Sequence, residues 1–413
     1  MSVVVNLLEI LIILVPVLMT VAFVTIAERK IMASMQRRCG PNAVGVWGLM
    51  QPFADALKLL VKEIIIPRQS NNLLFIIGPC ITLIFALIGW SIIPFGEGLA
   101  IFDYELGVFF ALAVSSIGSY GILISGWAAN SKYAFMGAIR STAQLLSYEL
   151  VFSSIIFILI VFSGSFSLTY IIECQQAVWN IFPLMPIGLM FFISILAETN
   201  RPPFDLPEAE SELVAGFMTE HSASVFVFFF LGEYSSLILM SAFMSIFFLG
   251  GYHCPDLHKL LLDPIYNYYN YYFSSDINNL NNSINIKFNC DNDIKSFENN
   301  FVDSYYTDIS NLKELNYIME FKVFDYTKFS IKDMIWEFIN ILVDKIQGSY
   351  IFGFKIIIVV FFFIWVRASF PRLRYDQLMS LCWKELLPLV FAYILFTLCL
   401  FYAFDMMPYG INF

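Results

Sequence analysis

Long, nearly uninterrupted runs of apolar residues are the feature that most limits how this chain can fold. A helix needs about 20 consecutive apolar residues to cross the hydrocarbon core of a bilayer, and the 413-residue chain contains several runs of that length. Of its residues 59% are hydrophobic and 14% are charged, whereas soluble domains carry about 25% charged residues. The sequence therefore predicts an all-α, polytopic membrane protein and excludes a soluble globular one.

Eight segments are predicted to cross the membrane. They are 3–26, 73–95, 105–127, 145–163, 181–197, 223–250, 352–370 and 386–404. The loops after the second and fourth spans contain acids but no Lys or Arg, whereas the loops after the odd-numbered spans are basic. Because Lys and Arg accumulate on the inner side of a membrane, the basic loops are predicted to face the cytoplasm or the mitochondrial matrix, and both termini the opposite side.

The polarity of the chain changes abruptly after the sixth predicted span. Residues 1–253 form a predicted transmembrane core and 349–413 carry the last two spans, whereas 254–348 are polar and rich in Asn. We interpret this segment as a long extramembrane insertion on the outer side, because long loops cross a membrane largely regardless of their charge. The seven cysteines show no spacing typical of metal ligands, so no metal or iron–sulfur site is predicted in this chain.

A short segment on the basic side, 48–64, has the pattern of an amphipathic helix. Its apolar residues share one face, while Asp55, Lys58 and Lys62 line another. Such a helix can lie flat at a membrane surface with its apolar face in the lipid boundary. It either anchors the loop or forms the lip of an opening that is reached from the bilayer.

An acidic loop interrupted by prolines follows the fifth predicted span. Between residues 198 and 220 the only basic residue is Arg201, and the acids are Glu198, Asp205, Glu208, Glu210, Glu212 and Glu220. Three prolines prevent a regular helix in the first half. Burial of several of these acids together would raise the pKa of some of them; the alternative is a solvated acidic loop.

Two further glutamates lie within predicted spans, Glu149 in the fourth and Glu233 in the sixth. A charge at bilayer depth costs roughly 2.5–3.5 kcal/mol, so such residues usually face the protein interior and serve a function. Together with Glu198 and Glu220, they could form a chain of carboxylates suited to proton relay. The alternative is a structural role as neutral hydrogen-bonding groups.

Several motifs resemble those of the membrane subunit 1 family of respiratory complex I. They are Ala27-Glu-Arg-Lys, Arg38-Cys-Gly-Pro-Asn, Gln51-Pro-Phe-Ala-Asp-Ala-Leu-Lys, Ser131-Lys-Tyr-Ala, Ser147-Tyr-Glu, the acidic loop from Ala197 to Gly216, and Pro371-Arg-Leu-Arg-Tyr-Asp-Gln-Leu-Met. The resemblance covers residues 1–253 and about 350–413 in consistent order, and the acidic loop is its most specific part. Residues 254–348 depart from the family pattern, so the resemblance assigns them no role.

This resemblance implies a subunit of a proton-pumping NADH:ubiquinone oxidoreductase of the mitochondrial inner membrane, with no complete active site in this chain alone. Ubiquinone would be the substrate, and flavin and iron–sulfur clusters would belong to partner subunits. The implied partners are peripheral-arm subunits at the quinone site, small membrane subunits, antiporter-like subunits and membrane lipid, with no nucleic acid.

The resemblance also implies three groups of site residues. The quinone chamber and its entrance would be formed by Glu28, Arg29, Arg38, Asp55, Arg201 and Asp205. The proton path would contain Glu149, Glu198, Glu208, Glu210, Glu212, Glu220 and Glu233. Counter-charges would come from Arg140, Arg367, Arg372 and Arg374.

Two other functions remain open at this stage. One is a membrane subunit of a membrane-bound hydrogenase, against which the proline-rich loop and the entrance helix argue. The other is a proton-coupled secondary transporter, which would predict internal repeats and broken helices near mid-membrane. The sequence shows no such repeat. The glutamates within the spans argue against a bare structural scaffold.

Overall fold

The computed structural model describes residues 2–176, 178–205, 216–253 and 331–404, and this part of the chain is helical without strands. Contacts divide the chain into two units, Met1–Pro255 with Asp344–Phe413, and Asp256–Val343. All sites considered below lie within the first unit. The predicted insertion 254–348 and the acids Glu208, Glu210 and Glu212 fall largely or wholly outside the described residues.

The helices have the following order and bounds. They are α1 (Ser2–Met35), η1 (Val46–Gly48), α2 (Gln51–Val61), α3 (Asn72–Ile88), η2 (Gly89–Ile92), α4 (Gly107–Ala128), α5 (Lys132–Ser163), α6 (Leu168–Glu173), α7 (Met185–Glu198), η3 (Gly216–Met218), α9 (Ala223–Phe248), α12 (Ile331–Ser369), α13 (Tyr375–Ser380), the π-helical η5 (Leu381–Leu386) and α14 (Leu387–Ala403).

Seven helical segments of the described chain are long and apolar enough to cross a membrane. The fifth predicted span corresponds to α7, an apolar helix of 14 residues. At 1.5 Å per residue α7 is about 21 Å long, shorter than the roughly 30 Å hydrocarbon core. The prediction of a polytopic all-α membrane protein is confirmed, with seven long helices and one short helix where eight full spans were predicted.

Several predicted spans were too short because each was ended at the first charged residues. Helix α1 continues to Met35, so Glu28 and Arg29 are helical instead of lying in a loop. Helix α5 begins at Lys132, 13 residues before the predicted start, where the side chain of Ser131 accepts a hydrogen bond from the backbone N–H of Ala134. Backbone hydrogen bonding continues past the apolar stretch wherever the polar side chains can reach the interface or a buried partner.

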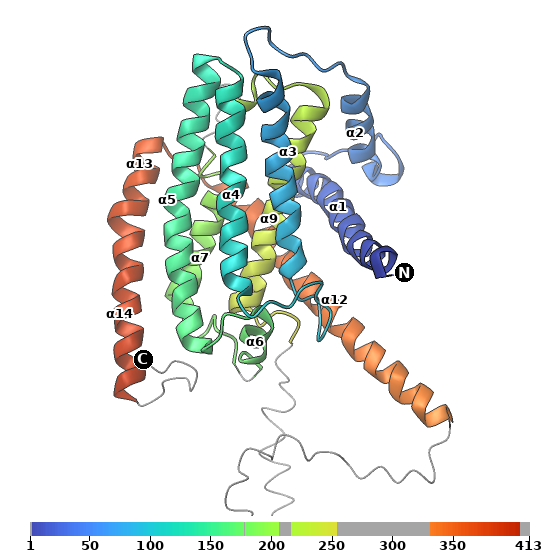
Figure 1. The fold of residues 1–413 in the computed structure, drawn as a ribbon, viewed down its shortest axis with the longest axis vertical. Helices are drawn as coiled ribbons and strands as arrows, with labels where there is room; N and C mark the ends of the chain where they lie inside the picture. Colours follow the sequence, from blue (N-terminus) through green and yellow to red (C-terminus); the bar gives the residue numbers. More distant parts are fainter. Residues whose placement is uncertain (1, 177, 206–215, 254–330, 405–413) are drawn as a thin grey trace, which may run out of the picture. The chain divides into compact units, whose positions relative to one another are not determined.

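The central helices are α5 and α9. In their most apolar stretches 61% and 56% of the residues are buried, against 17% in α1 and in the segment Tyr375–Ala403. Figure 1 shows α3, α4, α5 and α9 side by side, with α14 next to α5 and α1 inclined away from the others. The peripheral helices therefore present most of their apolar surface to the membrane.

Helices α3 and α4 approach each other closely because glycines face each other across the contact. A Cβ at Gly121 would come within 2.8 Å of the backbone oxygen of Gly78, and a Cβ at Gly78 within 3.0 Å of the backbone oxygen of Gly121. Small residues allow such close packing between membrane helices. This contact places the polar residues of α4 next to α3 and α9.

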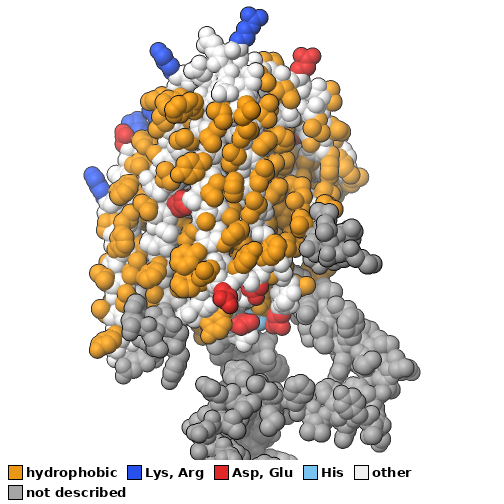
Figure 2. Space-filling model, viewed as in Figure 1, with side chains coloured by type: hydrophobic (Ala, Val, Ile, Leu, Met, Phe, Trp, Pro, Cys, Tyr) orange, Lys and Arg blue, Asp and Glu red, His pale blue; other side chains and the backbone are white. Residues whose placement is uncertain are grey.

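Charged side chains gather at the two ends of the helices. In Figure 2, hydrophobic side chains cover the side of the molecule, Lys and Arg lie toward the end at the top, and several Asp and Glu gather at the opposite end. This distribution is the one expected of a bundle that spans a membrane with its basic end inside.

Candidate functional site

The carboxylate of Glu28 is the centre of a buried charge cluster toward the basic ends of the helices. Glu28 lies in α1 and is 4% exposed. Its Oε1 accepts a hydrogen bond from Arg201 Nη1 at 2.9 Å and another from Arg367. Its Oε2 accepts one from the Tyr234 hydroxyl at 2.7 Å. One carboxylate thus connects α1, the turn after α7, α9 and α12.

Arg201 is held in its charged form by this environment. Burial by itself would lower the pKa of the Arg201 guanidinium, but the neighbouring Tyr234 and Glu28 outweigh it and raise the pKa above its ordinary value. The guanidinium also lies 4.3 Å from the centre of the Tyr234 ring, in a cation–π contact. The cluster therefore keeps a fixed positive charge beside an acceptor and a phenol.

The turn that carries Arg201 is fixed by Gln144 of α5. The buried side-chain amide of Gln144 donates to the backbone oxygens of Ala197 and Phe204, both at 2.8 Å. At the end of the turn, buried Asp205 lies 3.5 Å from Arg372. The predicted lack of regular helix in the first half of the acidic loop is confirmed for residues 199–205.

The predicted amphipathic helix is present as α2, and it is attached to α1 by charged groups. Arg29 Nη1 donates to Asp55 Oδ2 at 2.9 Å, and Gln51 donates to the other carboxylate oxygen at 3.0 Å. On its other side α2 exposes large apolar side chains, with Leu57 64% and Leu60 65% exposed. This arrangement suits a helix that lies at the membrane surface.

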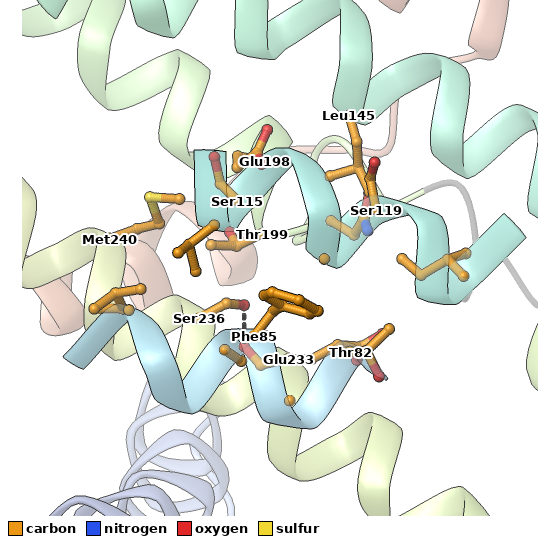
Figure 3. A pocket seen from close by; sticks show the side chains of 18 of the residues that line it. Thr82, Phe85, Ser115, Ser119, Leu145, Glu198, Thr199, Glu233, Ser236 and Met240 are labelled. Atoms are coloured by element: carbon orange, nitrogen blue, oxygen red, sulfur yellow. Dashed lines mark hydrogen bonds between the residues drawn. The ribbon is translucent and has the colours of Figure 1, made fainter. Parts of the chain in front are cut away.

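A small pocket with a mainly apolar lining, into which two glutamates and several hydroxyl groups are set, lies between α3, α4, α9 and the end of α7. Its volume of about 110 Å³ is sufficient for several water molecules. In Figure 3, Glu198 lies beside Ser115 and Thr199 on one side of the pocket, and Glu233 lies with Ser236 on the other. Two carboxylates from different helices therefore line one cavity that can hold water.

Glu149 extends this polar region on the α5 side. It is half-buried, and its carboxyl is within hydrogen-bonding reach of Ser115, which lines the pocket. The charge on Glu149 also acts on Glu198, and the charge on Glu233 acts on Arg201. Glu149, the two glutamates of the pocket and the Glu28 cluster are thus close enough to act on one another electrostatically.

Other predicted site residues lie apart from this region. Exposed Arg38 donates to Gln36 at 2.8 Å, and Arg140 lies 5.9 Å from the centre of the Tyr375 ring. Neither Arg140 nor Arg374 forms an ion pair with an acid in the part of the chain that the structure describes. Pairing of these arginines with Glu208, Glu210 or Glu212, and a role for half-buried Glu220, stay predictions.

Three residues of the site were not predicted: Gln144, Ser115 and Tyr234. A detectable signal was present for Gln144, an amide directly before the apolar run that begins at Leu145. Ser115 gave a weaker signal, because serines are common in membrane helices and usually bond to their own backbone. Ser115 itself also donates to the backbone oxygen of Leu112.

Comparison with known proteins is consistent with this architecture. The sequence matches the profile of the family described as NADH dehydrogenase over residues 8–398. It is 49% identical over 410 residues to a protein of Podospora anserina named NADH-ubiquinone oxidoreductase chain 1, with 99% of each chain covered. It is 41% identical over 402 residues to the protein of the same name from Chondrus crispus, covering 97% of this chain and 98% of the relative. The chain belongs to the NADH dehydrogenase family.

Proposed function

We propose that the chain is the core membrane subunit of a NADH–ubiquinone oxidoreductase of the mitochondrial inner membrane, and that it forms part of the ubiquinone chamber. The names of its relatives support the enzyme complex, and the Glu28 cluster carries the assignment of the chamber. Membership of the NADH dehydrogenase family favours this function over the hydrogenase subunit and the secondary transporter.

The entrance to the chamber would lie between α1 and α2. Phe23 of α1 and Phe53 of α2 meet edge to face with 6.4 Å between ring centres, and the Arg29–Asp55 pair closes the polar side. An isoprenoid tail could remain against the apolar faces of these helices while the quinone ring moves inward. The ring would then approach Glu28.

The cluster would stabilise charge as the quinone is reduced. Reduction creates a negatively charged quinone species that must take up protons. Guanidinium groups fixed in a buried site stabilise such a charge without having to reorganise, and Arg201 and Arg367 are held in place by Glu28 before substrate arrives. The Tyr234 hydroxyl, which donates to Glu28, connects the same carboxylate to α9.

The pocket that contains Glu198 and Glu233 would carry the response toward the pumping subunits. A charge change at the cluster reaches Glu233 through Arg201, and Glu233 shares a pocket that can hold water with Glu198. Glu149 follows through Ser115. Rearrangement of the loop that contains Glu208, Glu210 and Glu212 would accompany this change between discrete states.

Electrons would reach the chamber from flavin and iron–sulfur clusters in the peripheral-arm subunits. The antiporter-like and small membrane subunits would receive the proton-coupled signal. In this arrangement the chain supplies part of the substrate chamber and of the coupling path, while the redox centres lie in its partners.

Replacing Glu149 or Glu233 with Gln tests the coupling path. Each substitution keeps the shape of the side chain but removes its ability to exchange a proton, so we expect proton translocation in sealed vesicles to be lost or strongly reduced. Exposed Glu173, on the outer side, gives the matched control Glu173→Gln, which should pump normally. Normal pumping in Glu149→Gln and Glu233→Gln would contradict the relay role while leaving the quinone chamber untouched.

A further inference from the structure

An apolar groove lies along α1 on the side that faces α12, and it shares no lining residue with the pocket that contains Glu198 and Glu233. Its volume is about 980 Å³. On α1 it follows one helix face from Ile12 to Ile31, and on α12 it follows another from Ser349 to Ile364. Residues 98–101 close its outer end. Several lining side chains are also exposed, among them Ile12 at 68% and Ile357 at 66%, so the groove is open to the surroundings of the helices.

The length of the groove suits the hydrocarbon chains of a lipid. From Ile12 to Ile31 the rise along α1 is about 28 Å at 1.5 Å per residue. The acyl chains of one leaflet reach through about half of the roughly 30 Å hydrocarbon core. The groove is therefore long enough to hold them along its outer part.

The lining is mostly apolar. None of the groups of the charge cluster (Glu28, Arg201, Tyr234 and Arg367) is among the described residues that line the groove. The polar side chains of the lining are Trp90, Ser349 and Thr20, whose hydroxyl donates to the backbone oxygen of Val17 at 2.7 Å. A chain in this groove is held mainly by apolar contact, which suits the acyl chains of a membrane lipid.

Among the described residues, those at the outer end of the groove are mainly acidic, and this charge selects among lipid headgroups. Exposed Glu97 directly precedes Gly98 of the lining, and Asp103 follows in the same loop. Burial, and then the charges of Glu173, Glu97 and Asp103, raise the pKa of nearby Tyr252 to about 12.

The neighbouring cation does not offset this charge toward the lipid. Buried Lys355 donates to the backbone oxygens of Leu249, Gly251 and His253 and is not among the described residues that line the groove. An anionic headgroup would be repelled at this end, whereas a headgroup with a terminal ammonium would be attracted.

From these observations we infer that the α1–α12 groove binds the acyl chains of a zwitterionic phospholipid of the outer leaflet, with the ammonium of its headgroup near Glu97. Such a lipid would fill space between two helices that pack little against each other, since α1 is among the least buried helices. This inference does not depend on the proposed role of the chain in quinone reduction.

Gly353 allows the groove to be filled without disturbing the protein. A Cβ added at Gly353, a lining residue, meets no other atom within 4 Å. In Gly353→Leu the side chain would occupy the groove, and Gly353→Ala is the matched control that adds one methyl group. Glu97→Lys reverses the charge at the outer end.

The measurement is the number of phospholipids of each class that remain bound to the membrane complex after purification in mild detergent, determined by mass spectrometry. We expect Gly353→Leu to lose one phosphatidylcholine or phosphatidylethanolamine per complex, Gly353→Ala to keep it, and Glu97→Lys to exchange it for an anionic lipid. An unchanged lipid count in Gly353→Leu overturns the inference, as does loss of cardiolipin instead. Unchanged lipid together with a raised KM for long-tailed but not short-tailed ubiquinone would assign the groove to the quinone tail and also overturn it.

Discussion

Glu28→Gln and Asp55→Asn form a matched pair that tests whether burial decides the importance of an ion pair in this chain. In both pairs the Arg Nη1 to carboxylate oxygen distance is 2.9 Å. The side chains of Arg201 and Glu28 are 9% and 5% exposed, whereas those of Arg29 and Asp55 are 52% and 39% exposed. The two substitutions therefore remove the same kind of contact in different surroundings.

The expected magnitudes differ by several kcal/mol. Removing one partner of a buried ion pair costs about 3–5 kcal/mol, because the remaining charge stays buried without compensation. In Glu28→Gln the loss is aggravated by the second guanidinium, Arg367, since two buried positive charges then share a neutral amide oxygen in place of a carboxylate oxygen. An exposed ion pair contributes about 0–1 kcal/mol. A cost of about 3 kcal/mol corresponds to a factor of more than about 100 in the equilibrium constant between the intact and the disrupted site.

The assay is NADH:ubiquinone reductase activity in membranes that contain the variant chain. It is normalised to electron transfer from NADH to a hydrophilic acceptor, which reports on the redox centres of assembled partner subunits. We expect ubiquinone reduction to fall by at least about 100-fold in Glu28→Gln and by less than about five-fold in Asp55→Asn. Equal losses in the two variants, or near-normal activity in Glu28→Gln, would refute the reasoning from burial.

Three further changes have effects that follow from local geometry. Gly48→Ala places a Cβ about 2.1 Å from the backbone oxygen of Pro41 at a φ of +75°. The loop before α2 should therefore be displaced and be cleaved faster by a protease. The control Val46→Ala, at an exposed position, should leave the rate of cleavage unchanged. Gln144→Leu leaves two backbone oxygens without their donor, and each unsatisfied oxygen costs about 1–3 kcal/mol of stability. This variant should lower both the thermal midpoint and the rate of ubiquinone reduction. Gln144→Glu should lower both even more. Burial lowers the pKa of His221, stacked on Phe75, to about 4. The neutral His221 ring therefore contributes its full stabilisation above pH 6.5, and this stabilisation is lost as the pH falls toward 4. In His221→Phe the thermal midpoint should no longer fall between these two pH values on account of this residue.

Much of the architecture could be predicted because a bilayer allows few solutions. A run of apolar residues must be helical in lipid, where every backbone group needs an internal partner. The membrane class, the helix positions and the amphipathic helix follow from that requirement. The helix ends were less predictable, since charged residues such as Glu28 and Arg140 were left outside the predicted spans although they lie within helices.

The partners within the charge cluster could not be predicted from the residues alone. Glu28 is separated from Arg201 by 173 positions and from Arg367 by 339. Charge indicates that these residues need partners, but the pairing depends on how the helices are arranged. In one sequence, any of the arginines on the inner side was an equally suitable partner for Glu28.

Burial of a polar side chain is the property that separates the site from the rest of the inner surface. Arg29 and Arg201 carry the same charge, and both pair with a carboxylate at 2.9 Å, yet only Arg201 is buried. A buried charge persists only if the surrounding chain compensates it at every hydrogen-bonding position, and here the carboxylate of Glu28 is compensated by residues from three other segments. Displacement of any one of α1, α9, α12 or the turn after α7 therefore changes the electrostatic potential felt by the other three. This dependence makes the cluster suited to convert a charge change on a substrate into helix movement, because a change at one member cannot be absorbed locally.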